Sequence, residues 1–593
     1  MSSPRSFYTA QKASFEGQLA SIKKMLVQSS IIRLLVFCAM ILVIYFFYEN
    51  AKLWVPMLAG CIILFFYLIH RHANLSEERD KILALVAINQ TELDVLDGDI
   101  SGLASGKEFK QGDHYYSYDL DLFEDGSFFQ YVNRTVLPSG KQALAASLAS
   151  NETHTIEAKQ RAVQELAAMP VWRQDFAATG SLVNVEVSSN HILHWFQNHK
   201  SFVPKSMRYI PQLFLGVSLL IFVLNYLSLA PLSVTIIWLF VGISITGAYL
   251  KKINQLYLHA NKAKDTFKQY YQLLERIEKT DFSSEILQNQ QGKIKTDTVK
   301  ASQIFKQFSK LLDAFDQRNN MMIGVFANGY ALRDLQLCYR IEEWMTTYAD
   351  QVEKWFEVIA FFDAQNSFAN YTFNHPEFVF PKLSTNSDVI RAKVLGHPVL
   401  DKEKRIDNDF TIAQGQFFII TGANMAGKST FLRTVSLAIV MANVGLPVCA
   451  KSFDYTPKKL ITSMRTSDSL TNDESYFFSE LKRLKMIVDA LDAEEDQTGY
   501  FIILDEILKG TNSEDKAKGS KKFIEKLVAS NAMGIIATHD LSLCEVAVDL
   551  PQVKNYYFDA EISNDLLHFD YLLKVGVCQN MNASFLLNKM GIV

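Results

Sequence analysis

The chain has 593 residues, a formal net charge of −4 and a hydrophobic fraction of 49%. This length allows several domains, and the near-neutral charge excludes a global basic field that would attract nucleic acid to the whole surface. The six cysteines are scattered, with no CxxC pair and no histidine at zinc spacing, which indicates free thiols in a reducing compartment.

Two pairs of apolar runs predict four transmembrane helices. The first pair covers residues 34–48 and 53–69, and the second covers residues 213–229 and 232–250. Each run has about the length that crosses the hydrocarbon core of a bilayer, and none has the period of a surface helix. The alternative interpretation is two buried helical hairpins in a large soluble core, but the very short loops favour membrane hairpins.

Basic residues flank both pairs on their outer sides. They are Lys23, Lys24, Arg33, Arg71, Arg79, Lys81, Lys205, Arg208, Lys251 and Lys252. Because cytoplasmic flanks of membrane helices carry an excess of Lys and Arg, this pattern predicts that both termini and the C-terminal region are cytoplasmic. We therefore expect a location in a membrane of the bacterial cytoplasmic type.

The segments outside the apolar runs are polar and mostly helical in pattern. Residues 83–96 and 141–166 have helical periodicity, and residues 254–363 predict long antiparallel helices. Residues 251–310 carry twelve Lys and Arg against six Asp and Glu. This basic face fits DNA phosphates, an anionic membrane surface or a solvated helix, and the sequence leaves these three alternatives open.

A nucleotide-binding motif begins near residue 417. Residues 417–421 form a buried-strand pattern that runs into a GxxxxGK[ST] loop and a helix through residue 442. In such a loop the backbone N–H groups surround phosphates, Lys428 reaches the β- and γ-phosphates, and the Ser429 hydroxyl ligates Mg²⁺. The predicted nucleotide-binding residues of this loop are Gly422, Ala423, Asn424, Met425, Ala426, Gly427, Lys428, Ser429 and Thr430.

Two further strand ends complete the predicted site. A buried strand at residues 500–504 leads into Asp505 and Glu506, and a strand at residues 534–538 leads into His539. The aspartate is placed to bind magnesium with Ser429, and the glutamate is placed to activate the attacking water. The sequence therefore predicts an ATP hydrolase that uses ATP and Mg²⁺, with Lys428, Glu506 and His539 as catalytic residues.

These motifs resemble those of the MutS family of mismatch-repair ATPases, which belongs to the ABC class. The resemblance covers residues 421–433 and 505–511 closely, and residues 469–480 are similar to the family's signature loop. It implies that Ser475 contacts the γ-phosphate across a homodimer and that DNA is a partner. Asp473 and Glu474 differ from the glycine and arginine that are common in the family.

The expected fold is an α/β P-loop ATPase domain of the ABC type, preceded by a mostly α-helical MutS-like core with two transmembrane hairpins. Only about thirty residues precede the first apolar run, so we expect no N-terminal mismatch-recognition domain. The expected divisions are an N-terminal cytoplasmic segment, the first hairpin, the first part of the core, the second hairpin, the long-helix part of the core and the ATPase domain, at residues 1–30, 31–70, 71–205, 206–252, 253–390 and 391–593.

The leading hypothesis for function is a membrane-anchored, MutS-like ATPase that acts as a nucleotide-switched dimer in DNA binding related to mismatch repair. The alternatives are an ABC-type membrane transporter and a nucleotide-gated membrane scaffold that does not act on DNA. The apolar runs lack ionisable residues inside their spans, apart from Arg33 near an edge, which disfavours a path for a polar substrate.

Overall fold

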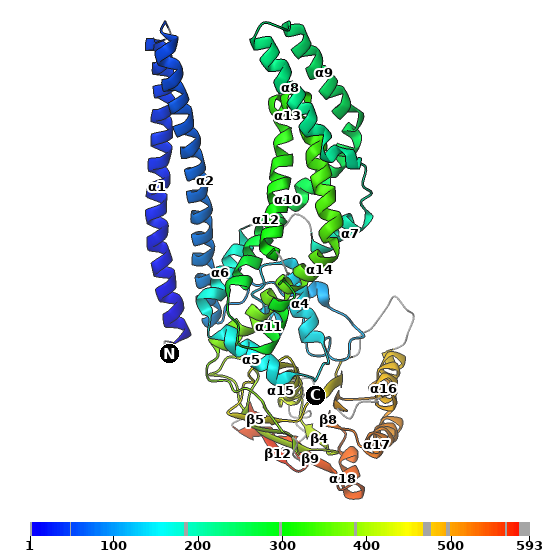
Figure 1. Cartoon of the computed structure of the whole chain (residues 1–593). Helices are drawn as coiled ribbons and strands as arrows, with labels where there is room; N and C mark the ends of the chain where they lie inside the picture. The colour runs from blue at the N-terminus through cyan, green and yellow to red at the C-terminus, as the bar shows by residue number, and fades with distance from the viewer. Residues whose placement is uncertain are drawn as a thin grey trace.

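The computed structural model has two apolar arms that rise from a helical body, with an α/β region at the opposite end (Figure 1). It describes the following residues: 3–47, 49–182, 188–295, 299–384, 388–465, 476–493, 499–563 and 566–579. The N-terminus lies at the lower end of the first arm, so the chain ascends and descends this arm before it enters the body (Figure 1).

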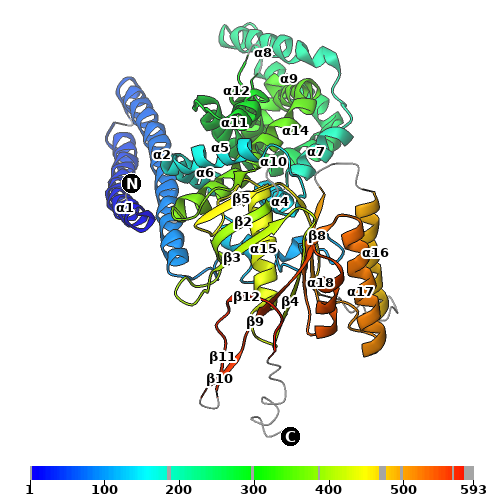
Figure 2. The ribbon, with the colours of Figure 1, turned by 90° about the horizontal axis from the view of Figure 1, so that it is seen from below.

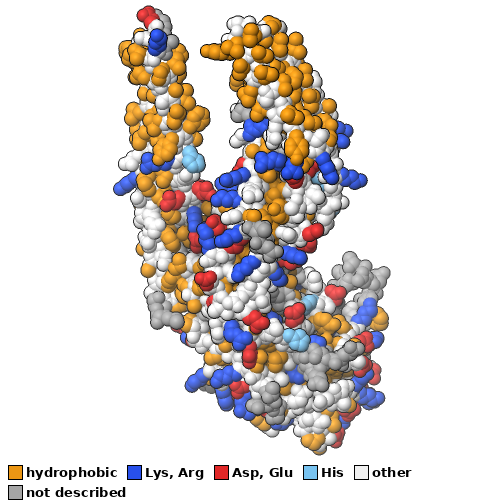
Figure 3. Space-filling model, in the orientation of Figure 1, with side chains coloured by type: hydrophobic (Ala, Val, Ile, Leu, Met, Phe, Trp, Pro, Cys, Tyr) orange, Lys and Arg blue, Asp and Glu red, His pale blue; other side chains and the backbone are white. Residues whose placement is uncertain are grey.

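The first arm is a hairpin of two long helices, α1 (Pro4–Phe47) and α2 (Ala51–Leu96), which pack against each other. In its lower half, Leu19, Ile22 and Ile82 form a small buried cluster. The upper half exposes large apolar side chains, and hydrophobic side chains gather at the same level on the other arm (Figure 3). Charged side chains lie below this level on both arms (Figure 3). Each helix of the first arm thus combines an apolar end with a more polar base.

The second arm contains three helices rather than the predicted two. These are α8 (Ile210–Tyr226), α9 (Leu232–Ala248) and α13 (Met321–Ala331). The side chain of Ser218 links them, because its hydroxyl accepts from Trp238 Nε1 at 2.8 Å and donates to the Tyr330 carbonyl at 2.7 Å. Helix α13 was not predicted as part of this arm, because its 11 residues are too short to suggest a membrane span.

Length and apolar composition identify fewer candidate membrane spans than the sequence predicts. Among the described residues, only α1 and α2 are long and apolar enough to cross a membrane, and the second arm adds one span if α9 and α10 (Leu250–Lys279) count together despite a 67° bend. Helix α8 has 17 residues, or about 25 Å at 1.5 Å per residue, which is shorter than the ~30 Å hydrocarbon core. Four separate spans therefore remain a prediction.

The body is built around long helices, as residues 254–363 predict. Helices α10, α12 (Ala301–Asp316) and α14 (Arg333–Asn374) pack against one another. Their core is aromatic, and Phe308 stacks on Trp344 with ring centroids 3.8 Å apart. Shorter helices surround these, namely α3 (Phe128–Val132), α4 (Pro138–Ala149), α5 (Ile156–Ala167), α6 (Pro170–Ser181), α7 (Ser189–Asn198) and α11 (Glu285–Gly292).

The C-terminal part is a mixed α/β region with two main sheets (Figure 2). The strands of the larger sheet, in spatial order, are β12 (Leu573–Val575), β9 (Val553–Phe558), β4 (Phe417–Gly422), β8 (Met533–Ala537), β7 (Tyr500–Asp505) and β6 (Lys459–Ser463). All neighbours in this sheet are parallel except β12 and β9. The strands of the smaller sheet are β1 (Lys382–Leu383), β5 (Ser452–Tyr455), β2 (Asp388–Leu395) and β3 (Asn408–Ala413). A separate hairpin pairs β10 (Glu561–Ser563) with β11 (Leu566–His568).

Helices cover both faces of the six-stranded sheet. On one face, α15 (Lys428–Asn443) shares a buried cluster with residues of β4 and of the smaller sheet. On the other face, α16 (Tyr476–Asp492) and α17 (Ser513–Ala529) contribute to a second cluster, and α18 (Val546–Asp549) lies close by. Parallel strands with helices on both faces place their carboxyl ends at one edge, which is where such folds bind ligands.

A segment of the body reaches the edge of this sheet. The Tyr115 carbonyl accepts from the Thr462 amide at 2.9 Å, and the Asp119 carboxylate accepts from the Arg465 amide at 2.9 Å. The Arg483 guanidinium on α16 also donates to the Tyr115 carbonyl at 2.7 Å. The helical body and the α/β region therefore share a hydrogen-bonded boundary beside β6.

Candidate nucleotide site

The loop between β4 and α15, which carries the predicted phosphate-binding motif, contains two glycines with positive φ. Gly422 and Gly427 have φ values of 148° and 99°, in the region that favours glycine. A Cβ at Gly422 would lie 2.6 Å from the Phe558 carbonyl oxygen, so a larger residue would clash with β9. Met425 also has a positive φ, of 68°, and its side chain is 77% exposed. The loop leads into the N-terminus of α15, which attracts anions.

Lys428 is the first residue of α15, and its side chain folds back over the loop. Its Nζ donates to the carbonyls of Gly422 and Ala423, at 2.8 Å each, and lies 3.4 Å from Nε2 of His539. Burial lowers the pKa of Lys428, against the opposing effect of the Asp505 and Glu506 carboxylates. A bound anion would offset this cost of burying the ammonium group.

Ser429 and Asp505 come together although 76 residues separate them in the chain. The Ser429 hydroxyl donates to Oδ2 of Asp505 at 2.6 Å, and burial raises the pKa of Asp505. A divalent cation between these oxygens would favour the ionised carboxylate. The described residues contain no group of three or more His, Cys, Asp or Glu side chains that could hold a metal. Hydroxyl and carboxylate oxygens such as this pair are the ligand types that Mg²⁺ accepts, and Mg²⁺ usually keeps further ligands from phosphate and water.

Glu506 and His539 form the third contact at the strand ends. Glu506 Oε1 lies 2.7 Å from His539 Nε2, and this contact outweighs burial and lowers the pKa of Glu506 to about 2. Glu506 has a φ of 51°, an uncommon conformation for a residue that is not glycine. Such backbone strain persists where surrounding structure enforces it, often at functional sites. The turn after β7 thus directs this ionised carboxylate toward β8.

These side chains surround one pocket of about 570 Å³, which is large enough for a small-molecule ligand. Of the predicted residues, Asn424, Met425, Gly427, Lys428, Ser429, Thr430, Asp505, Glu506 and His539 line the pocket, whereas Gly422, Ala423 and Ala426 do not. Gly422 and Ala423 reach it indirectly, through the carbonyls that accept from Lys428. Ser475, with Asp473 and Glu474, lies outside the described residues.

Further residues that were not predicted complete the lining of this pocket. His397, Arg405, Asn408, Lys509 and Tyr571 also line it. The Asn408 side chain donates to the Tyr571 carbonyl at 3.0 Å and accepts from the Leu573 amide at 2.7 Å, which holds β3 to the start of β12 and the residues before it. Two of these residues had a local signal, His397 in a Gly-His-Pro sequence and Lys509 three residues after Glu506. Arg405, Asn408 and Tyr571 come from distant segments without a spacing pattern.

Comparison with known proteins finds sequence similarity in the region that contains this site. A family model described as MutS domain V matches residues 418–587. The human MutS protein homolog 4 is 31% identical over 217 residues, which are 35% of this chain and 22% of that protein. The DNA mismatch repair protein MutS of Staphylococcus haemolyticus is 28% identical over 273 residues, 45% of this chain and 30% of that protein. The C-terminal region of the chain therefore matches a MutS-family domain and is similar to MutS-family proteins.

The similarity covers only part of the length of each relative. A plant relative, the DNA mismatch repair protein MSH4 of Arabidopsis thaliana, is 29% identical over 221 residues, 36% of this chain and 27% of that protein. The chain therefore spans less than a third of the length of each of these relatives. Both apolar arms lie outside the residues that match MutS domain V.

The pocket combines residues inside and outside MutS domain V. Lys428, Ser429, Asp505, Glu506 and His539 lie within the matched range. His397 and Arg405, in the connection between β2 and β3, and Asn408, the first residue of β3, precede it. The smaller sheet thus supplies the far wall of a pocket whose strand-end residues belong to the family's domain.

Proposed function

We propose that this protein binds Mg-ATP in the 570 Å³ pocket and hydrolyses it. The observation that carries the proposal is the convergence of Lys428, the Ser429–Asp505 pair and the Glu506–His539 pair on adjacent strand ends. Lysine, hydroxyl and carboxylate groups in this arrangement suit a triphosphate with its magnesium ion. The family relationship supports the same activity.

Each residue has a role that follows from its position. Lys428 would release the Gly422 and Ala423 carbonyls and donate to phosphate oxygens, while Ser429 and Asp505 would hold Mg²⁺. The ion would neutralise the charge that develops on the phosphates. Glu506, ionised at neutral pH, would orient the attacking water and accept from it, and His539 would donate to the γ-phosphate.

The rate of ATP turnover by the purified chain tests this assignment. Replacing Glu506 with Gln preserves its size and removes the charge, so turnover should fall by about 10²- to 10⁴-fold while nucleotide still binds. A matched control is Glu514→Gln, which changes an exposed glutamate paired with Lys518 on α17. Equal turnover in wild type and Glu506→Gln would remove Glu506 from the mechanism and favour a nucleotide-gated scaffold.

We further propose that both arms insert into one membrane and leave the α/β region and both termini in the cytoplasm. Support comes from the exposed apolar ends of the two arms, which point the same way, and from the basic residues at their flanks (Figures 1 and 3). Exposed apolar surface of this extent marks a contact with lipid or protein. A bilayer would cover both arms at once.

Thiol labelling tests the membrane proposal, because Cys38 lies in the apolar part of α1 and is exposed. In vesicles, Cys38 should resist a charged maleimide until detergent is added. A cysteine placed at exposed Ser14, lower on the same helix, should react from the cytoplasmic side without detergent. Equal reactivity of the two positions in intact vesicles would contradict insertion of the first arm.

The family further supports a dimer, switched by nucleotide, that acts on DNA in a process related to mismatch repair. The similarity to MutS protein homolog 4 favours a heterodimer over the homodimer that the sequence predicts. Gel shifts with homoduplex, mismatched and branched DNA, with and without ATP, test the DNA component. The absence of binding at low salt would contradict it, since phosphate contacts are strongest there. The transporter alternative predicts turnover that responds to a transported solute in vesicles and not to DNA.

A further inference from the structure

Exposed basic side chains gather at the base of the second arm, where its apolar helices begin and end (Figure 3). Helix α8 begins at Ile210, directly beyond the short helix η2 (Lys205–Arg208) and Tyr209. Helix α9 ends at Ala248, and α10 begins at Leu250. The exposed basic residues of these two junctions form what we call the basal cluster, namely Lys200, Lys205, Arg208, Lys251 and Lys252.

The two junctions lie next to each other in the folded chain. Lys252 Nζ, at the start of α10, lies 5.8 Å from the centre of the Phe202 ring, which precedes α8. The Phe202 amide donates to Oε1 of Glu342 on α14 at 3.0 Å, and η2 packs against the same helix. The basal cluster therefore combines cations that are distant in sequence at one level of the arm.

The basal cluster has no acidic partner in the described part of the chain. Residues 200–209 and 249–264 contain no Asp or Glu, and no ion pair joins the five cations to a described carboxylate. Glu342, which is 4% exposed, accepts from the amides of Phe202 and Val203 and lies 2.9 Å from Nε2 of His199. The oxygens of this carboxylate are therefore already occupied.

Other cations near the base of this arm are paired. Lys264 Nζ lies 2.8 Å from Oδ2 of Asp316, and Arg318 Nε lies 3.0 Å from Oδ2 of Asp334. The basal cluster instead keeps its positive charges exposed to the surroundings. Like charges at one level repel one another, and an anion beside them would offset that repulsion.

Apolar surface begins directly beyond the basal cluster. Tyr209 is 61% exposed, and Leu213, in the first turn of α8, is 70% exposed. In membrane proteins, tyrosine and Lys or Arg at the end of an apolar helix lie at the level of the lipid headgroups. A group of about four to eight Lys and Arg at the cytoplasmic end of a membrane helix is typical of a site for anionic lipids.

The same charges suit the phosphates of DNA, but their position favours lipid. A bilayer around α8 and α9 would place its headgroups beside the basal cluster, because the cluster lies at the ends of these helices. DNA would have to approach through that layer, and anionic headgroups would repel it.

We propose that the basal cluster binds the phosphate groups of anionic phospholipids in the leaflet that faces the α/β region. This inference rests on the proposed insertion of the arms and adds the class of lipid and the residues that select it. The Lys and Arg side chains would donate to phosphate oxygens, and the acyl chains would lie against α8 and α9. Each cation would increase the affinity for such a lipid by a factor of about five.

Native mass spectrometry of the full chain in a nonionic detergent tests the proposal, with dioleoylphosphatidylglycerol and dioleoylphosphatidylcholine as probes. We expect the anionic lipid to bind more tightly, by roughly tenfold or more, and this preference to fall as the salt concentration rises. Equal affinity for the two lipids would overturn the proposal.

The Cys38 labelling described above reports insertion separately. Equal lipid affinities in a chain whose Cys38 is protected in vesicles would refute the lipid preference alone. Reactive Cys38 in intact vesicles would refute insertion and, with it, this inference.

A pair of substitutions locates the binding. Lys251→Gln with Lys252→Gln should weaken binding of phosphatidylglycerol by about 25-fold and leave binding of phosphatidylcholine unchanged. The matched control is Lys522→Gln with Lys526→Gln, which removes two exposed lysines from α17 in the α/β region. Equal binding of phosphatidylglycerol by the two double variants would refute the assignment.

A second pair separates lipid from DNA. Lys205→Gln with Arg208→Gln removes the cations of η2 and should weaken binding of phosphatidylglycerol to a similar extent. A short DNA duplex should not displace the bound lipid from the unmodified chain. DNA binding that is lost in this variant, with lipid binding kept, would assign the basal cluster to DNA and refute the proposal.

Discussion

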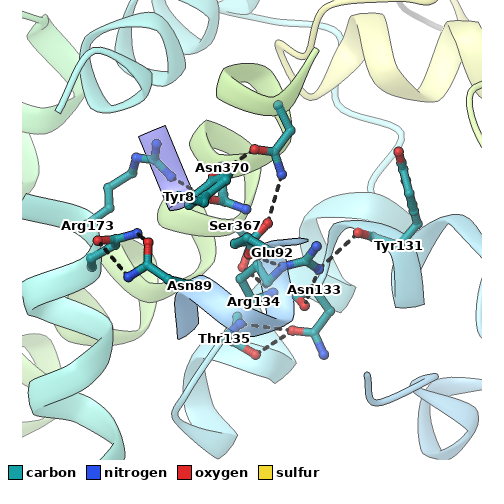
Figure 4. A network of polar contacts seen from close by, with 12 residues as sticks. Tyr8, Asn89, Glu92, Tyr131, Asn133, Arg134, Thr135, Arg173, Ser367 and Asn370 are labelled. Atoms are coloured by element: carbon teal, nitrogen blue, oxygen red, sulfur yellow. Dashed lines mark hydrogen bonds and ion pairs between the residues drawn. The ribbon is translucent and has the colours of Figure 1, made fainter. Parts of the chain in front are cut away.

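The two arms have similar apolar ends but are joined to the body in different ways. The first arm is held at its base by polar contacts between separate helices (Figure 4) and by the packing of Phe7 and Tyr8 against Phe373. The second arm is continuous with the body, because α9 runs into α10 with a single bend, and α13 lies between α12 and α14 in the chain. Opening the first arm requires only side-chain contacts to break, whereas opening the second requires helices of the body to move.

The contacts of the first arm join residues far apart in sequence. The Tyr8 hydroxyl, on α1, donates to Oδ1 of Asn374 at 2.7 Å. On α2, Glu92 pairs with Arg134, and Asn89 accepts from Gln174 Nε2 at 2.9 Å. Charge and hydrogen bonding therefore contribute to the attachment of the first arm.

Removing the charge at the base of the first arm should have the largest effect. Glu92→Ala leaves the Arg134 guanidinium, which is 13% exposed, without its carboxylate. Breaking a buried ion pair in this way costs about 3–5 kcal/mol. Hydrogen exchange along α1 and α2 should rise sharply, while exchange in α8 and α9 stays unchanged.

The control for this variant is Glu77→Ala on the same helix. Glu77 is 46% exposed and lies 3.8 Å from Lys268, and an exposed pair contributes about 0–1 kcal/mol. Similar exchange in the two variants would show that the buried pair does not hold the first arm.

The second arm should instead be sensitive to steric change. A Cβ at Gly242 on α9 would lie 2.3 Å from the Gly329 carbonyl oxygen on α13. Gly242→Ala should therefore force the two helices apart, at a cost of about 1–3 kcal/mol, and lower the midpoint of thermal unfolding in micelles. Gly247→Ala, on the same helix with no atom within 4 Å of the new Cβ, should leave the midpoint nearly unchanged. Equal midpoints in both variants would contradict this contact.

Lowering the pH should weaken the attachment of the first arm more than that of the second, and this effect should be smaller than those of the substitutions above. Burial would raise the pKa of Glu92, but the Arg134 ion pair and hydrogen bonds outweigh it and leave the pKa below its usual value. A carboxyl group with a lowered folded-state pKa stabilises above its unfolded pKa of about 4.5 and loses this contribution as the pH falls through the folded value.

Hydrogen exchange between pH 6 and pH 3, corrected for intrinsic rates, measures this effect. Opening of the first arm should increase below about pH 4.5, and the increase should be absent in Glu92→Gln. An identical response of the two arms to acid, or an unchanged response in Glu92→Gln, would contradict the role of this carboxyl group.

The candidate nucleotide pocket shows which parts of a functional site can be predicted from the amino-acid sequence. The strands at β4, β7 and β8 were predicted and are confirmed, because a buried strand and the polar residues after it form one local pattern. Arg405 and Tyr571 lie in the same pocket but 166 residues apart, and only the folded chain reveals their proximity.

The arms likewise show that continuous sequence patterns predict single elements but not contacts between distant ones. Apolar composition predicted the helices α1, α2, α8 and α9, since this signal is continuous along the chain. Helix α13 was not predicted as part of the second arm. The position of such a short apolar helix depends on packing against helices that lie elsewhere in the sequence. The Glu92–Arg134 pair likewise has no local signature, because its two members belong to different segments of the body and arm.

The smallest expected effect concerns a single hydroxyl at the base of the first arm. Tyr8 is 1% exposed, and Tyr8→Phe removes its hydrogen bond to Asn374 while keeping the ring that packs against Phe373, with centroids 5.7 Å apart. The loss should be about 1 kcal/mol, visible as a modest rise in hydrogen exchange confined to α1 and α2. Tyr45→Phe, at the exposed apolar end of α1, is the control and should change nothing in water-accessible amides. Because Tyr8→Phe alters no charge, its effect should also be independent of pH between 6 and 3, which separates the hydrogen-bonded part of the attachment from the part contributed by Glu92.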